Sequence, residues 1–114
     1  MIISTTELRL KSIAKFLPAI RLSGKIINEA QRAPGVLHVR AHPTSLRTLV
    51  TLTAWESEEA MMQFVRSGTH LEAMKQTAVL ASDTRSAHWE ANKIPSLKEA
   101  RLRLDQPVVD VRKR

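Results

Sequence analysis

One stretch of the sequence, residues 49–77, limits the fold more than any other, because a strand pattern changes there into two helical patterns. Residues 49–55 alternate between two sets of side chains, which is typical of a half-buried β-strand. Ser57 has the position of a helix N-cap, and the two glutamates after it suit the positive end of the helix dipole. We expect this helix to stop at Ser67-Gly68, where a second helix starts. The stretch therefore predicts a strand that leads directly into two short helices.

Both helices carry an apolar stripe. Thr69 and Glu72 have the spacing of a capping box, which predicts that His70 is the first residue of the second helix. Apolar residues recur at helical spacing in each helix, so each can bury one side against a sheet. The stripes are Met61, Phe64 and Val65 in the first helix, and Leu71, Met74 and Ala78 in the second.

The rest of the chain completes a β-α-β-β-α-β order. We predict strands at 2–10, 36–42, 49–55 and 83–91, a helix at 18–33, the helical region 56–81, a helix that starts at Ser96 and a short edge strand at 107–111. The short polar link between the second and third strands predicts an antiparallel hairpin. This order is typical of an α+β, ferredoxin-like fold, in which helices cover one face of an antiparallel sheet. We expect one domain over residues 1–114, with 95–114 as a C-terminal appendage.

The strand patterns also predict what each face of the sheet carries. We expect the aliphatic set of each strand to meet the helices, including Val39, Val50, Leu52, Ala54 and Trp89. The opposite, open face is then expected to carry His38, Arg40, His42, Thr51, Thr53, Trp55, Ser86 and His88. An open face that includes Leu49 and Trp55 favours association, so we predict a homodimer.

Composition removes several classes of function. The absence of cysteine excludes disulfides, thiolate nucleophiles and Cys-ligated metals, and three glycines leave no phosphate-cradling loop or Rossmann turn. The net charge of +7 raises the question of nucleic acid, but Lys and Arg are scattered and the only dense run is 112–114, which argues against that partner. No apolar run approaches the roughly 18 residues that span a bilayer, so we expect a soluble, cytoplasmic protein without a membrane partner.

The run TLTAWESEEAMMQFVRSGTH at 51–70, which continues into HLEAM, and the later HWE resemble the antibiotic-biosynthesis-monooxygenase superfamily of dimeric α/β barrels. Within it the chain is most similar to the small bacterial branch related to spheroidene monooxygenase. The resemblance implies a barrel formed by two sheets, with a ligand pocket between each sheet and its helices or inside the barrel. It implies a monooxygenase-like oxidoreductase that uses either no cofactor or haem. Haem-degrading members have Trp at the position of Phe64 and a haem-ligating His at that of Met74, which puts haem degradation in doubt here.

These patterns give candidate site residues. His70 is the candidate catalytic residue, because a neutral imidazole at a helix start can accept a proton or bind a metal or haem; the alternative is that it caps or packs locally. The candidate substrate-binding residues are Trp55, Thr51, Thr53, His38, Arg40, His42 and His88, with a dimer interface or simple packing as the alternative role. No carboxylate accompanies the histidines of 38–42, so no metal site is predicted.

Three functions follow from these candidates. The first is a monooxygenase-like enzyme that binds a small apolar or aromatic molecule in a barrel pocket. The second is a dimer that binds a small ligand without catalysis. The third, nucleic-acid binding, depends on charge alone.

Overall fold

The computed structural model describes residues 1–105 of the chain, apart from the side chain of Thr69. Within these residues, four strands form one sheet, and four α-helices and one 3-10 helix pack around it. The elements are β1 (Ile2–Leu10), η1 (Ile13–Lys15), α1 (Phe16–Gln31), β2 (Val36–Ser45), β3 (Thr48–Trp55), α2 (Glu58–Val65), α3 (Gly68–Leu80), β4 (Ala81–Glu90) and α4 (Leu97–Asp105).

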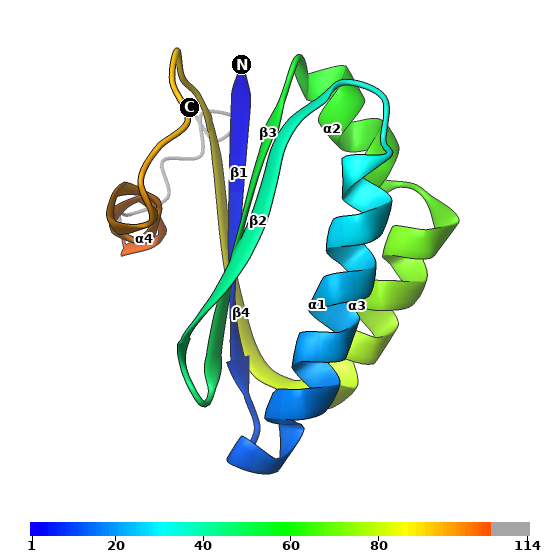
Figure 1. Cartoon of the computed structure of the whole chain (residues 1–114), viewed down its shortest axis with the longest axis vertical. Helices are drawn as coiled ribbons and strands as arrows, with labels where there is room; N and C mark the ends of the chain where they lie inside the picture. The colour runs from blue at the N-terminus through cyan, green and yellow to red at the C-terminus, as the bar shows by residue number, and fades with distance from the viewer. Residues whose placement is uncertain (106–114) are drawn as a thin grey trace, which may run out of the picture.

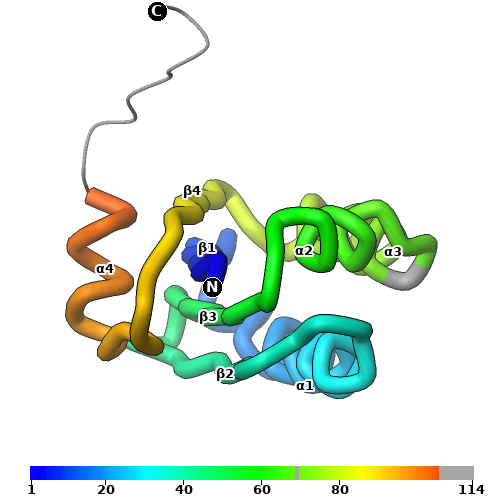
Figure 2. Tube along the Cα trace, turned by 90° about the horizontal axis from the view of Figure 1, so that it is seen from above, coloured from blue at the N-terminus to red at the C-terminus, as the bar shows by residue number. Residues whose placement is uncertain are grey.

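The sheet has the order β2-β3-β1-β4, and every neighbouring pair is antiparallel. This confirms the predicted α+β, ferredoxin-like fold, including the β2–β3 hairpin. Figure 1 shows α1, α2 and α3 on one side of the sheet and α4 on the other, and Figure 2 shows the same three layers from above. We call the side toward α1, α2 and α3 the helix face and the side toward α4 the far face.

The register shows which side chains share a face, because directly paired residues project to the same side. Thr53 pairs with Ser4 of β1 and with Val39 of β2, and all three lie on the helix face with Trp55. Ile3, Leu52 and Ala54 lie on the far face, where they are at most 1% exposed and pack with Ala100 of α4.

The predicted faces are therefore right for β2 and wrong for β3 and β4. Val39 points to the helices, and His38, Arg40 and His42 point away from them, as expected. Thr51, Thr53 and Trp55 were expected on the open face, but they meet the helices. Ser86 and His88 pair with Thr6 and Ser4 and so project to the same face, but they are exposed there. Their aliphatic neighbours Val50, Leu52, Ala54 and Trp89 lie on the far face, because α4 provides a second apolar layer there.

Helix α4 turns the predicted appendage into a third layer. Ser96 Oγ accepts a hydrogen bond from the Glu99 backbone N–H at 3.2 Å, as the capping prediction requires, and Ala100 and Leu104 are buried. The far face is consequently not open over β1 and β4. Leu49 and Trp55 are each only 1% exposed, so the argument for a dimer from their exposure is wrong.

The structure differs from the predictions in the N-cap of α3, in the buried side of α3 and in the end of β2. The N-cap of α3 is Ser67 and not Thr69, which makes His70 the third helical residue. The expected stripe of α3 is wrong, because Leu71 and Met74 are 50% and 53% exposed whereas Ala73 is buried. Strand β2 runs on past Pro43 to Ser45, which an edge strand tolerates because its outer N–H groups have no neighbouring strand. The expected strand 107–111 lies outside the described residues.

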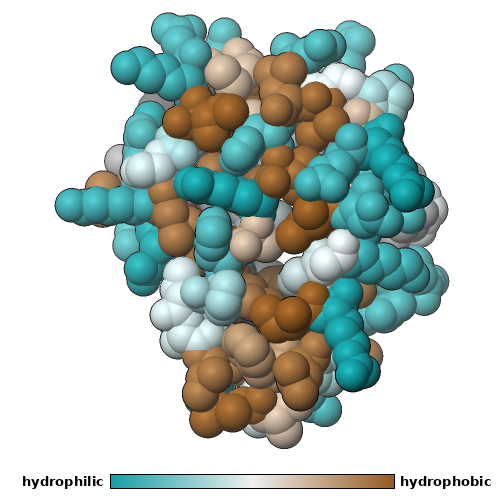
Figure 3. Space-filling model, in the orientation of Figure 1, coloured by the Kyte–Doolittle hydropathy of each residue, from teal (hydrophilic) through white to brown (hydrophobic). Residues whose placement is uncertain are grey.

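The outer surface is apolar at one end. Figure 3 shows hydrophobic side chains gathered at its lower end, where η1 and the β2–β3 turn lie. Ile13, Leu17 and Leu46 are each more than half exposed in this part of the chain. Within residues 1–105, none of the helices has the length and apolar character needed to cross a bilayer.

Candidate functional site

A cavity of about 80 Å³ lies between the helix face of the sheet and the helices that cover it. Its floor carries four hydroxyl-bearing residues of β1 and β3, and its walls are aliphatic and aromatic. The lining residues are Ser4, Thr6, Thr51 and Thr53 on the floor, with Ile26, Ala30, Val39, Trp55, Met61, Phe64, Val65 and His70 around them.

The hydroxyl floor follows from strand pairing. Ser4 lies opposite Thr53, and Thr6 lies opposite Thr51, so two alternating strands place four hydroxyl-bearing side chains in two adjacent rows. Thr53 also connects the floor to the wall: its Oγ1 accepts a hydrogen bond from Trp55 Nε1 at 2.9 Å and donates to the Ser4 carbonyl at 3.4 Å. These bonds fix the Trp55 indole at the edge of the cavity.

Three aromatic side chains form one wall. The Phe64 ring lies 5.4 Å from the Trp55 ring, with 30° between their planes, and 5.1 Å from the His70 ring, with 64° between theirs. Both distances are in the range of favourable aromatic pairs. Phe64 comes from the end of α2 and His70 from the start of α3, so the short turn at Ser67 brings them together.

His70 is the one titratable group in the cavity lining. Burial lowers the pKa of its imidazole below the ordinary value of 6.5. A hydrogen bond between the ring and the Val65 backbone raises the pKa, but its effect is smaller than that of burial. The imidazole is therefore neutral at pH 7, as predicted, although burial and not the helix dipole is the main cause. Its Nδ1 is buried and has no hydrogen-bond partner among the described residues. A neutral ring with a free nitrogen can accept a proton or a hydrogen bond.

The candidate residues divide into two groups. One group lines the same cavity and consists of His70, Trp55, Thr51 and Thr53. His38, Arg40 and His42 lie on the far face of β2, and His88 is exposed on the edge strand β4.

The histidines on the far face form no metal site. His38 Nε2 and Arg40 Nε are buried without partners, and Arg40 Nη2 makes one long contact of 3.5 Å with the Pro95 carbonyl. Within residues 1–105, no three histidines or carboxylates gather closely enough to hold a metal ion.

The sequence-based search missed part of the lining. Ser4 and Thr6 of β1 were not among the candidates, although their alternation in a β-branched strand was visible. Phe64 was predicted as a packing residue and also separates Trp55 from His70. Ile26 and Ala30 of α1 complete the wall.

Haem does not fit this cavity. Sites for drug-sized ligands have volumes of about 300–1,000 Å³, whereas this one has about 80 Å³. His70 offers a free nitrogen, but the space beside it is far too small for a macrocycle.

Comparisons with known proteins support the fold. The family model described as "Domain of unknown function (DUF3291)" matches residues 13–107. Among curated proteins no sequence matches the chain.

Solved structures of similar shape include a candidate antibiotic biosynthesis monooxygenase from Deinococcus radiodurans, with a TM-score of 0.77 and 17% identity over 85% of this chain and 98% of that one. Another candidate of this kind, from Nitrosomonas europaea, has a TM-score of 0.73 and 10% identity over 82% of this chain and 100% of that one. Rv0793 from Mycobacterium tuberculosis has a TM-score of 0.72 and 12% identity over 84% and 100%. The resemblance to the monooxygenase superfamily is confirmed at the level of fold, which is all that such identities show.

Proposed function

Because the chain belongs to the DUF3291 family, whose description assigns no activity, we propose a function from the cavity itself. The cavity binds a small apolar or aromatic molecule, and His70 takes part in a monooxygenase-like oxidation of that molecule. One observation carries the proposal: a neutral imidazole with an unpartnered Nδ1 lies in a cavity that is otherwise lined by aromatic, aliphatic and hydroxyl side chains.

Each part of the cavity has a role in this proposal. His70 accepts a proton from an acidic hydroxyl of the bound molecule, because a base works best when it is uncharged at the working pH. The resulting phenolate supplies the electrons that reduce dioxygen, as the cofactor-free oxygenases of the superfamily imply. One oxygen atom forms a new C–O bond at a ring carbon, which loses its hydrogen and becomes a quinone carbonyl. The other oxygen atom leaves as water, so that phenol and O2 give quinone and H2O. Trp55 forms a flat wall, and Thr51 and Thr53 offer hydroxyl groups beneath the ligand.

The proposal is tested by changing the base. A panel of phenols is offered to the wild-type protein and to His70→Gln, and oxygen consumption and binding heat are recorded. The wild type is expected to consume oxygen with at least one phenol, and His70→Gln is expected to lose about 100-fold or more of that rate while it still binds the ligand. Equal rates in the two proteins, or no oxygen consumption by the wild type, contradict the catalytic proposal.

A second function, ligand binding without catalysis, is favoured by the absence of a second acid or base from the cavity lining. In that case a ligand raises the melting temperature but is recovered unchanged. His70→Gln then alters affinity and nothing else. Recovery of an oxidised product from the wild type excludes this alternative.

We also propose that the protein is a homodimer, as the resemblance implies, with a second copy packed on the far face of β2. Helix α4 lies against β1 and β4, whereas β2 is an edge strand of the sheet. The support is that β2 is an edge strand and that its far-face side chains remain accessible, with His42 exposed and His38 and Arg40 partly exposed. Sedimentation is expected to give a dimer for the wild type and a monomer for Arg40→Glu. The same charge reversal at the exposed Arg21 of α1 is expected to leave the dimer intact. A wild-type monomer at micromolar concentration contradicts the proposal.

A further inference from the structure

We infer that Phe64 determines the specificity of the cavity: its ring fills the slot between Trp55 and His70 that a single aromatic ring of the substrate takes on binding. This inference rests on the proposed function, because it names the substrate class for the same site. It assigns a planar, one-ring phenol.

The Phe64 ring is in contact with both Trp55 and His70. Its centroid lies 5.4 Å from that of the Trp55 ring and 5.1 Å from that of the His70 ring. A substrate that is to be oxidised beside His70 and held against Trp55 has to lie between these two rings. That place is occupied by the phenyl ring of the protein itself.

The cavity is too small for an aromatic molecule while Phe64 is in place. A cavity of about 150 Å³ admits benzene, and the cavity beside Phe64 has only about 80 Å³. An aromatic molecule therefore does not enter while Phe64 stays in place. When the phenyl ring leaves, the cavity gains the space of one six-membered ring, with flat contact surfaces already in position on Trp55.

The Phe64 side chain can move out of its place more easily than its neighbours. Trp55 is 1% exposed and its indole N–H is hydrogen-bonded, whereas Phe64 is only partly buried and has no polar anchor. Phe64 also lies in the last turn of α2, next to the break at Ser67 and Gly68 where α3 starts.

The other end of α2 is fixed. Ser57 caps its first turn, and the Glu56 N–H donates to the Gly35 carbonyl at 2.8 Å. A rotation of the Phe64 side chain, or a small shift of the last turn, thus opens the slot without disturbing the helix start.

The chemistry of the slot favours a phenol over a plain hydrocarbon ring. His70 Nδ1 is buried and lacks a donor, and a hydroxyl on the rim of the incoming ring supplies one. Proton transfer from that hydroxyl to Nδ1 gives a phenolate and an imidazolium, so the charges balance within the cavity.

The test measures binding of phenol itself. Phe64→Ala is made in a Trp89→Phe background, so that Trp55 is the only tryptophan and its fluorescence reports on the slot. Phenol is expected to bind Phe64→Ala at least tenfold more tightly than the Trp89→Phe parent. Met61→Ala is the matched control, since Met61 lies on the same helix and lines the same cavity but is not between the two rings. No gain in Phe64→Ala, or an equal gain in Met61→Ala, overturns the inference.

A second variant guards against loss of folding. Phe64→Leu keeps an apolar side chain and removes the flat ring, and circular dichroism checks that it is folded. A gain in phenol affinity that is smaller than that of Phe64→Ala but larger than that of Met61→Ala supports the inference. No gain in phenol affinity overturns it.

This test measures phenol binding and not oxidation, so it separates the inference from the proposed reaction. If Phe64→Ala binds phenol more tightly but the wild type consumes no oxygen, the inference about Phe64 is supported and the proposed oxidation is contradicted. If the wild type consumes oxygen but Phe64→Ala does not bind phenol more tightly, the proposed oxidation is supported and the inference about Phe64 is contradicted.

Discussion

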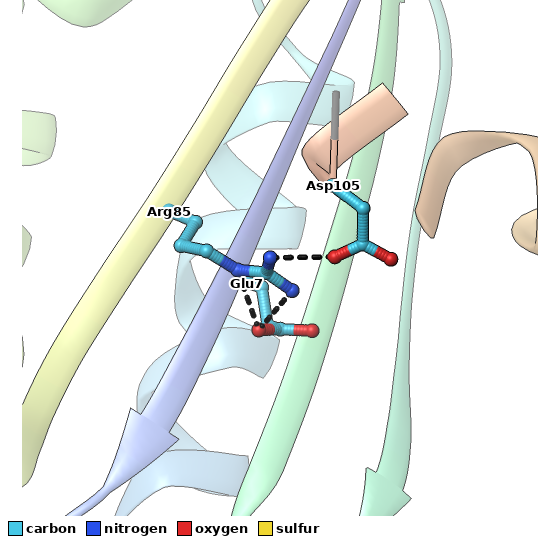
Figure 4. Close-up of polar contacts among 3 residues, drawn as sticks. All are labelled: Glu7, Arg85 and Asp105. Carbon is cyan, nitrogen blue, oxygen red and sulfur yellow. Dashed lines mark hydrogen bonds and ion pairs between the residues drawn. The ribbon is translucent and has the colours of Figure 1, made fainter. Parts of the chain in front are cut away.

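The guanidinium of Arg85 on β4 binds the carboxylate of Glu7 on β1 through two nitrogens, with Nε at 3.1 Å and Nη2 at 2.9 Å from the same oxygen, Oε1 (Figure 4). Its third nitrogen, Nη1, binds Asp105 of α4 at 2.6 Å. The Glu7 side chain is only 7% exposed, whereas that of Asp105 is 63% exposed. Arg85 therefore neutralises a buried acid of the sheet and also ties the end of α4 to the far face.

Substitutions at these residues test which of the two ion pairs of Arg85, with Glu7 or with Asp105, contributes more to the free energy of unfolding. Arg85→Ala leaves the buried Glu7 carboxylate without its cation, and we expect a loss of about 1–3 kcal/mol in the free energy of unfolding. Asp105→Asn removes only an exposed ion pair, for which we expect a loss below about 1 kcal/mol. Urea denaturation measures both. Equal losses in the two variants contradict the assignment of Glu7 as the buried partner.

The fold was predictable because each element carries its own local signal. The alternating strands, the turn between β2 and β3 and the cap at Ser57 act over a few residues, and they imply the ferredoxin-like order without any long-range information. The choice of face was not predictable in this way. Strand β3 is apolar on both sides, with Leu49 and Trp55 on one and Val50 and Leu52 on the other, so periodicity separates two sets without saying which meets α1, α2 and α3. A third layer, α4, makes both sets buried.

The site was predictable only where one short segment supplies it. Trp55 and His70 lie within one stretch and were found, but Ser4 enters the cavity through its pairing with Thr53, which is remote in sequence. The start of α3 shows a related limit. Two candidate caps, Ser67 and Thr69, are two residues apart, and both have a side-chain oxygen that can accept a backbone N–H. The buried side of α3 was wrong for a separate reason: Leu71 and Met74 have helical spacing, but the side of α3 that is buried carries the smaller Ala73.

Removal of the observed cap tests this correction. Ser67 Oγ accepts a hydrogen bond from the His70 backbone N–H at 3.2 Å, so Ser67→Ala is expected to lower the free energy of unfolding by about 1 kcal/mol. Ser57→Ala removes the equivalent bond to Ala60 at the start of α2 and is expected to cost about as much. Only Ser67→Ala should also shift the NMR titration of the His70 imidazole. An unchanged stability in Ser67→Ala contradicts its role as the cap.

Replacement of Gly35 by alanine is expected to destabilise the protein, whereas the same replacement at Gly24 is not. Gly35 has a φ of 83°, and a Cβ added to it would lie 2.5 Å from the Cβ of Ala60, so Gly35→Ala is both strained and overpacked. We expect a loss of roughly 1–3 kcal/mol in thermal or urea unfolding. The double variant Gly35→Ala/Ala60→Gly should recover the part due to overpacking and retain the part due to backbone strain.

Gly24 provides the matched control for this change. It lies in the middle of α1 with no atom within 4 Å of an added Cβ, so Gly24→Ala should stabilise the protein by about 0.4–1 kcal/mol. A loss of similar size at both glycines would show that the close contact with Ala60 is not the cause.

The buried imidazole of His70 makes stability depend on pH in a defined direction. Its pKa is lower in the folded protein than the ordinary 6.5, so the unfolded chain binds a proton that the folded protein does not over the interval between the two values. This contribution to stability is unchanged above about pH 6.5, falls as the pH drops toward the folded pKa, and levels off below it. Urea denaturation at pH 7.5 and 5.5 should therefore show a larger loss for the wild type than for His70→Gln, which has no group to protonate. NMR titration of the His70 ring should place its midpoint below 6.5, and a midpoint at or above 6.5 would mean that Nδ1 is already satisfied and that His70 is not the base.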